Sequence, residues 1–117
     1  MNEDIKKFLV ENFDCHSIGE DSYAVHLPLF YPNSDKQITI GLLFDNEKLI
    51  ISDLGELVKD IFAVNPTYFL EQSTLKVLEK YDCEYHNGKI TMQTFGFDLR
   101  TAISEFCFMI VVLIDKL

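Results

Sequence analysis

Positive charge is scarce in this sequence. Ten Lys and Arg residues, only one of them arginine, stand against nineteen Asp and Glu residues, which gives a net charge of −9 at pH 7. A protein that binds nucleic acid needs clustered Lys and Arg side chains to replace the counterions on the phosphates, and an anionic lipid surface makes a similar demand. Direct binding to DNA, RNA or a membrane surface is therefore disfavoured, whereas a basic protein partner suits the charge.

Cysteine and glycine are also sparse. The three cysteines, Cys15, Cys83 and Cys107, are an odd number without the spacing of a disulfide framework, so we expect reduced thiols in a cytoplasm. The five glycines are scattered singly, which excludes the glycine-rich loops that bind phosphate groups. The sequence indicates no cofactor.

Long apolar runs are missing. The longest one, residues 106–114, has nine residues, whereas a helix needs about 20 to cross a bilayer. The first residues are acidic and then amphipathic, unlike the basic and then apolar order of a signal peptide. The sequence therefore predicts a cytoplasmic protein with no membrane segment.

What is present is the composition of a folded chain. Hydrophobic residues make up 48% and aromatic residues 13% of the 117 residues, which is more apolar content than disordered chains have. A chain of this length can bury one core without metals or disulfides. Because the sequence has neither an internal repeat nor a long linker, residues 1–117 are expected to form a single domain.

The spacing of apolar residues in the first half predicts one helix and three strands. Apolar residues at i, i+3, i+4 and i+8 indicate an amphipathic helix over residues 3–13. Alternating apolar residues then indicate strands over 23–29, 38–44 and 48–52. The connections between these strands are short, which only an antiparallel meander allows.

The second half predicts helices around a further hairpin. A helical stripe covers residues 54–62, and another helix is expected over 75–81. Asn87-Gly88 is the preferred pair for a two-residue hairpin turn, and Asp98 is placed to cap a last helix over about 99–116. The expected fold class is α+β, with a meander of three strands plus this hairpin packed against about four helices.

The turn at Asp53, Gly55 and Glu56 is the first candidate functional feature. Asp followed three residues later by Glu is a capping-box pattern, with Asp53 as the helix N-cap. Gly55 then falls inside the helix start, where glycine costs about 1 kcal/mol relative to alanine. Either something approaches the backbone there or the turn is tight. The amides of a helix start can also bind an anion, although two carboxylates compete for that end.

The segment Ser52-Asp53-Leu54-Gly55 resembles the signature of a prokaryotic family known as domain of unknown function 1828. The resemblance extends over about residues 20–117 and implies a strand that ends in a Ser/Thr-Asp-x-Gly piece and starts a helix. Leu54 stands where a second Asp or a Gly is expected. The resemblance implies a bacterial or phage context and transfers no catalytic residue.

Acidic residues near strand ends are the second candidate, namely Asp35, Asp45 and Glu47. Together with the acids of the Asp53 turn, two of these carboxylates have the chemistry to hold Mg²⁺ in a small metal-dependent hydrolase. The Glu-x-Lys part of a common nuclease pattern is missing, because Lys48 follows Glu47 directly. Residues 1–60 carry twelve acids against five lysines, net −7, which also suits an inhibitor that imitates the charge of nucleic acid.

Two cysteine–histidine pairs, Cys15-His16 and Cys83-x-x-His86, have the ligand types of a structural zinc site. Cys83 and His86 point to opposite faces of a strand, so no metal site is expected. None of the cysteines has the setting of a catalytic nucleophile.

The last helix is the third candidate, because residues 106–114 are apolar on every side. A surface helix needs an apolar stripe of only about 100°. A partner surface is therefore expected to cover the side that the sheet leaves free, and the candidate interface residues are Phe106, Phe108, Met109 and Val112. A homodimer is one such arrangement. The alternative is a central helix wrapped by its own sheet and the first helix.

Since no catalytic constellation emerges, the sequence favours a non-enzymatic protein-interaction or regulatory module of a bacterium, phage or mobile element. Two alternatives stay open, an acidic phage-type inhibitor that imitates nucleic-acid charge and a small metal-dependent hydrolase.

Overall fold

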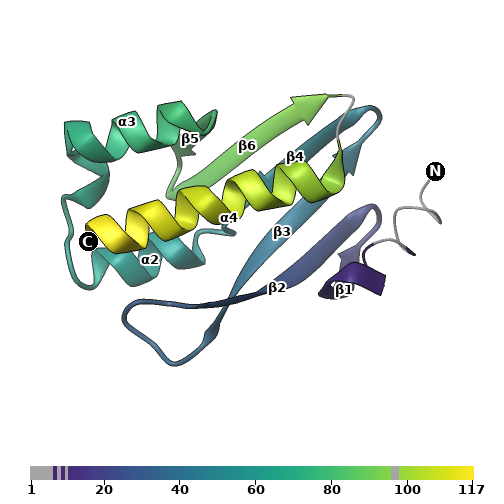
Figure 1. The fold of residues 1–117 in the computed structure, drawn as a ribbon, viewed down its shortest axis with the longest axis horizontal. Coiled ribbons are helices and arrows are strands. Elements are labelled where there is room, and N and C mark those ends of the chain that lie inside the picture. Colours follow the sequence, from purple (N-terminus) through teal and green to yellow (C-terminus); the bar gives the residue numbers. More distant parts are fainter. Residues whose placement is uncertain (1–6, 8, 10, 96–97) are drawn as a thin grey trace.

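Six strands and three α-helices make up the described part of the chain, which is residues 7, 9, 11–95 and 98–117 of a computed structural model (Figure 1). The strands are β1 (Asp14–Gly19), β2 (Ser22–Phe30), β3 (Gln37–Asp45), β4 (Lys48–Ser52), β5 (Cys83–His86) and β6 (Lys89–Phe95). The helices are α2 (Glu56–Phe62), α3 (Gln72–Lys80) and α4 (Leu99–Lys116), with a 3-10 turn, η1 (Tyr68–Leu70), before α3. The α+β class is confirmed.

All six strands lie in one antiparallel sheet in the order β1-β2-β3-β4-β6-β5. β1 to β4 form a meander, and the β5–β6 hairpin joins it because β6 pairs with β4. This hairpin has the predicted register, with Cys83 opposite Met92 and Tyr85 opposite Ile90. Asn87 and Gly88 both adopt positive φ, which is what a two-residue turn of this kind requires.

The meander has four strands, so the prediction of three is wrong. The additional strand is β1, and five of its six residues are exposed. An edge strand with so little burial carries no alternation of apolar and polar residues for a sequence pattern to show. The helix predicted over residues 3–13 lies mostly outside the described residues; Lys7, Leu9, Glu11 and Asn12 are helical.

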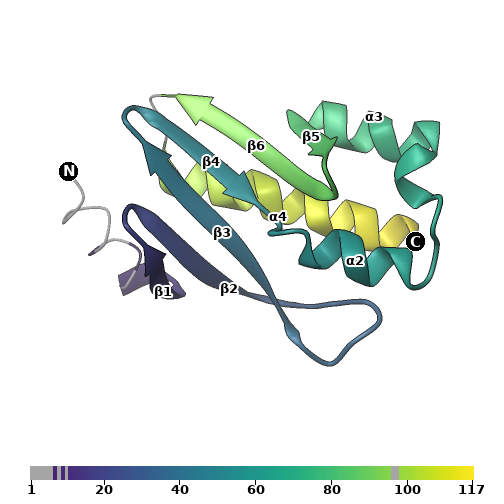
Figure 2. The same cartoon turned by 180° about the vertical axis from the view of Figure 1, so that it is seen from behind.

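One face of the sheet carries the core. α4 lies in front of the sheet in Figure 1 and behind it in Figure 2. The strand residues that point toward α4 are fully buried, among them Ile40, Leu42, Leu49, Ile51 and Ile90. The inner side of α4 is equally buried, through Phe106, Met109, Ile110 and Leu113. The opposite face of the sheet has no helix over it in the described part of the chain (Figure 2).

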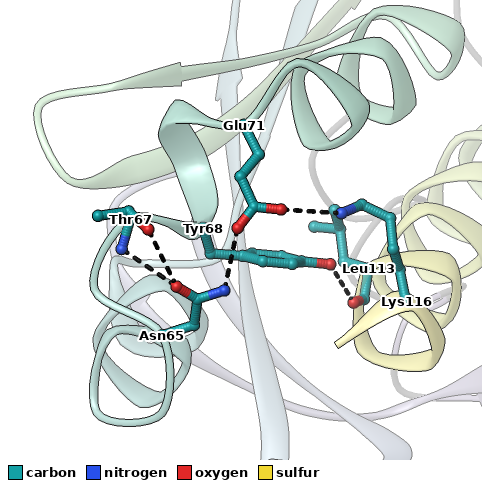
Figure 3. Close-up of polar contacts among 6 residues, drawn as sticks. All are labelled: Asn65, Thr67, Tyr68, Glu71, Leu113 and Lys116. Carbon is teal, nitrogen blue, oxygen red and sulfur yellow. Dashed lines mark hydrogen bonds and ion pairs between the residues drawn. The ribbon is translucent and has the colours of Figure 1, made fainter.

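α4 is fixed at both ends. At its start the side chain of Asp98 accepts hydrogen bonds from the amides of Arg100 at 3.0 Å and Thr101 at 3.4 Å, so Asp98 is the N-cap that the sequence predicts. At its end the hydroxyl of the buried Tyr68 in η1 donates to the carbonyl of Leu113 at 2.5 Å (Figure 3). The last four carbonyls of a helix have no intrahelical partner, so Tyr68 satisfies one of them.

Polar contacts support this anchor (Figure 3). The ammonium of Lys116 lies 4.4 Å from the centre of the Tyr68 ring and 3.7 Å from Glu71 Oε1. Glu71 in turn accepts a 3.1 Å hydrogen bond from the side-chain amide of Asn65. Burial raises the pKa of Tyr68, so its hydroxyl stays protonated and can donate to Leu113.

We expect Tyr68→Phe to lower the free energy of unfolding by about 1–2 kcal/mol, because the carbonyl of Leu113 then lacks a partner in a buried site. Urea unfolding monitored by circular dichroism measures the change. The matched control is Tyr81→Phe, since the Tyr81 hydroxyl bonds to none of the described residues, and its effect should stay within about 0.5 kcal/mol. Equal losses in the two variants would contradict the anchor.

Candidate functional site

The turn between β4 and α2 contains Asp53, the one charged side chain that is fully buried among the described residues, at 1% exposure. Its Oδ1 accepts hydrogen bonds from the amides of Ile90 at 2.8 Å and Gly55 at 3.0 Å. Its Oδ2 accepts from the amide of Val58 at 3.1 Å. The backbone amide of Asp53 also donates to the Ile90 carbonyl at 3.1 Å. Asp53 therefore connects the start of α2 to β6.

The predicted capping box is only partly correct. α2 begins at Glu56 and its N-cap is Gly55, so Asp53 stands two residues before the cap. It still bonds Val58, the third residue of α2, and so satisfies one of the amides that a helix start leaves free. Glu56 is exposed and makes no return bond to the amide of Asp53, because Ile90 already accepts from that amide.

Both features expected at Gly55, a tight turn and a close approach to its backbone, are present. Its φ is +78°, directly after Leu54 with φ +60°, so the turn is tight and left-handed. A Cβ on Gly55 would lie 3.2 Å from the carbonyl oxygen of Gly88, so another backbone also approaches it. Leu54 lies outside α2, although the predicted helical stripe includes it. Its side chain lies on Gly41 of β3, where a Cβ would come within 2.6 Å of it.

The Asp53 turn therefore has a structural role. Burial raises the pKa of Asp53, and the hydrogen bonds from the amides of Ile90, Gly55 and Val58 act in the opposite direction. Both carboxylate oxygens already accept from backbone amides. An anion or a metal ion at the Asp53 carboxylate would have to displace these bonds.

The structure separates the candidate acidic residues. Asp35 precedes β3 and Asp45 ends it, so roughly 30 Å of extended chain lies between them. Asp45 and Glu47 share the exposed β3–β4 turn, whereas Asp53 follows the other end of β4. Nowhere in the described part of the chain do three His, Cys, Asp or Glu residues come close enough to hold a metal ion.

The two cysteine–histidine pairs are also far apart, because β1 and β5 are the two edges of the sheet. Burial, with help from the carboxylates of Asp82 and Glu105, raises the pKa of Cys83 to about 12. Burial also raises the pKa values of Cys15 and Cys107. All three thiols are therefore neutral near pH 7, and a neutral thiol is a poor nucleophile.

The four candidate interface residues of α4 lie on two sides of the helix. Phe106 and Met109 are fully buried between α4 and the sheet, so their prediction as interface residues is wrong. Sequence spacing shows that α4 is apolar all round, but it does not show which side the sheet covers. Phe108 is 62% exposed and Val112 is half-buried, so the outer side of α4 keeps part of the predicted apolar surface.

The sheet face opposite α4 is an apolar surface that the sequence analysis missed. Leu43 and Ile50 form a cross-strand pair on this face, and Gln93 is opposite Ile50 on β6. Leu43 is 41% and Phe95 70% exposed. We call Leu43, Ile50, Leu54 and Phe95 the open-face cluster. The available signal was Leu43, an apolar residue among the polar positions of its strand.

Charge is scarce at the centre of this face. A complete row of residues runs across its six strands, and the four central members are Ala24, Gly41, Ser52 and Thr91. A shallow hollow lies beside the cluster, lined by Phe95 and the β3–β4 turn, including the candidate residues Asp45 and Glu47. Phe95 lies at the charged end of this face, opposite Lys48. An uncharged centre with a charged rim is typical of protein interfaces.

No family model matches the chain, and no curated protein or solved structure matches it either. Membership of the domain of unknown function 1828 family therefore stays a prediction. Among the described helices, none combines the length and the hydropathy needed to cross a bilayer.

Asp53→Ala should lower the free energy of unfolding by about 3 kcal/mol, because it leaves three backbone amides without their acceptor. Asp53→Asn keeps one oxygen for Ile90 and Gly55 and should cost less, about 1–2 kcal/mol. Chemical denaturation measures both, with Asp45→Asn as the exposed control, expected within about 0.5 kcal/mol. An unchanged free energy of unfolding in Asp53→Ala would show that this carboxylate is not a structural anchor.

Gly55→Ala should cost about 1–2 kcal/mol, because alanine is strained at positive φ and its Cβ meets the Gly88 carbonyl. Gly19→Ala is the matched control, since a Cβ there meets no atom closer than 3.8 Å. Thermal unfolding should show a lower Tm for Gly55→Ala and little change for Gly19→Ala. The same small change in both would argue against a strained turn at Gly55.

Proposed function

We propose that the chain is a non-enzymatic protein-binding module and that the open-face cluster is its main contact surface. The observation that carries the proposal is a six-stranded sheet whose second face exposes Leu43, Leu54 and Phe95, with no described helix over it. Full burial of one such side chain contributes roughly 1.5–3 kcal/mol. Within the monomer these side chains stay in contact with water.

The charge distribution supports a protein partner. The chain carries −9 overall, yet the centre of this face is uncharged and its acids lie at the rim, among them Asp45, Glu47 and Glu84. Depletion of charge at the centre of a surface patch distinguishes protein interfaces from ordinary surface.

The two alternative functions receive less support from this geometry. Imitation of nucleic acid needs the acids of residues 1–60 on one face, but Asp35 and Asp45 lie at opposite ends of β3, and Asp53 is buried. A metal-dependent hydrolase needs carboxylates that converge, and the residues predicted for it do not. We therefore propose neither.

Site-specific photo-crosslinking in cells that naturally produce the chain tests the proposal. A benzoylphenylalanine at position 43 or 95 should give a discrete crosslinked protein, whereas the same group at the exposed Lys76 of α3 should not. Leu43→Glu, combined with the crosslinker at position 95, should abolish the product while thermal unfolding stays cooperative.

Crosslinking to a second copy is recognised by a product of twice the chain mass and by light scattering of the purified protein, and it would identify the partner as the chain itself. The absence of any product from positions 43 and 95, or the same products from position 76, would contradict the proposed function.

A further inference from the structure

The two edges of the sheet differ in what they can accept. β5 has four residues and packs beside α3, which precedes it in the chain. β1 has six residues, and no described strand pairs with its outer side. Leu9, which precedes β1, is buried in the core cluster and so lies on the α4 side of the sheet. Within the described part of the chain, β1 is therefore the edge that is open to another strand.

The hydrogen-bond alternation identifies the backbone groups on that edge. The amide of Phe44 donates to the carbonyl of Asp21 at 2.9 Å, so the odd-numbered residues of β2 bond to β3. The even-numbered residues of β2 then bond to β1, at the pairs His26–Asp14 and Ala24–His16. The backbone N–H and C=O groups of Cys15 and Ser17 consequently point outward from the edge of the sheet, away from β2.

Charge around this edge selects the kind of strand that fits. Residues 11–21 contain four acids, Glu11, Asp14, Glu20 and Asp21, and no lysine or arginine. All but Asp21 are exposed. An added strand with Lys or Arg side chains would approach these carboxylates, and opposite charges on neighbouring strands stabilise a sheet.

A second copy of the chain fits this edge poorly. Antiparallel pairing of two β1 strands that sets the outward groups of Cys15 opposite those of Ser17 places the two-fold axis at His16. Asp14 of one copy then lies opposite Ile18 and diagonally across from Glu20 of the other, and this happens twice. Like charges at such positions are destabilising, and each copy also carries −9.

We propose that β1 binds a basic, extended segment of a partner protein as a seventh strand, through the backbone groups of Cys15 and Ser17. From the proposed function this proposal takes only the class of ligand, a protein. The β1 edge lies at a different part of the sheet from the open-face cluster. Strand addition of this kind takes affinity from main-chain bonds and specificity from alternating side chains.

The test uses a capped eight-residue peptide of alternating Lys and Val as the probe. Titration into the ¹⁵N-labelled chain should shift the amide signals of Cys15 and Ser17 most, and slow their hydrogen exchange. A peptide with Glu in place of Lys should not bind. A peptide with Gly in place of Val keeps the charge but loses strand propensity, and should bind at least tenfold more weakly.

Ser17→Pro removes the outward N–H without removing a bond to β2, and an edge strand tolerates proline. It should weaken binding of the Lys-Val peptide at least tenfold. Ser17→Ala is the matched control and should bind like the parent chain, since it loses only the 3.1 Å bond from the Ser17 hydroxyl to the Gly19 carbonyl. The double variant Asp14→Asn, Glu20→Gln should weaken binding severalfold and reduce its salt dependence.

Equal binding by the parent chain and Ser17→Pro, or equal binding of the Val and Gly peptides, would overturn strand addition at β1. A dimer of the free chain that Ser17→Pro converts to a monomer would make a second copy the occupant and overturn the basic partner. Leu43→Glu should leave peptide binding intact. Leu43→Glu thus tests the open-face cluster as a contact surface, and Ser17→Pro separately tests strand addition at β1.

Discussion

A buried carboxylate that accepts hydrogen bonds from three backbone amides joins the end of β4, the start of α2 and β6. Asp53 directly follows β4. Its carboxylate accepts hydrogen bonds from the amides of Gly55 and Val58 at the start of α2 and from the amide of Ile90 at the start of β6. A buried charge is costly unless hydrogen bonds replace its hydration, and these amides provide that replacement. Because β6 pairs with both β4 and β5, the same contact positions the hairpin on the sheet.

Helix α4 covers one face of a sheet that has apolar side chains on both. α4 buries its inner side on the strands and leaves Phe108 exposed, while Leu43 and Phe95 stay exposed on the other side of the sheet. One layer of helices on one sheet gives the chain a single core. The apolar residues beyond that core are the physical basis for proposing a binding module.

Local patterns predicted most of the fold, because alternation, caps and an Asn-Gly turn act over a few residues. They predicted β2, β3, β4, the β5–β6 register and the start of α4. β1 was missed because an exposed edge strand lacks buried alternation. Asp53 was interpreted as a simple helix cap, since its bond to Ile90 spans 37 positions. The side of α4 that is buried, and the separation of Asp35 from Asp45, depend on tertiary packing that spacing alone does not contain.

The central claim is that one face of the sheet is the core and the other is free for a partner. Hydroxyl-radical footprinting of the purified chain, at a concentration where light scattering shows a monomer, tests it most directly. We predict rapid oxidation of Leu43 and Phe95, and protection of Leu42, Ile51 and Phe106. Protection of Leu43 and Phe95 to the level of the core residues would show that this face is covered within the free chain and would contradict the account.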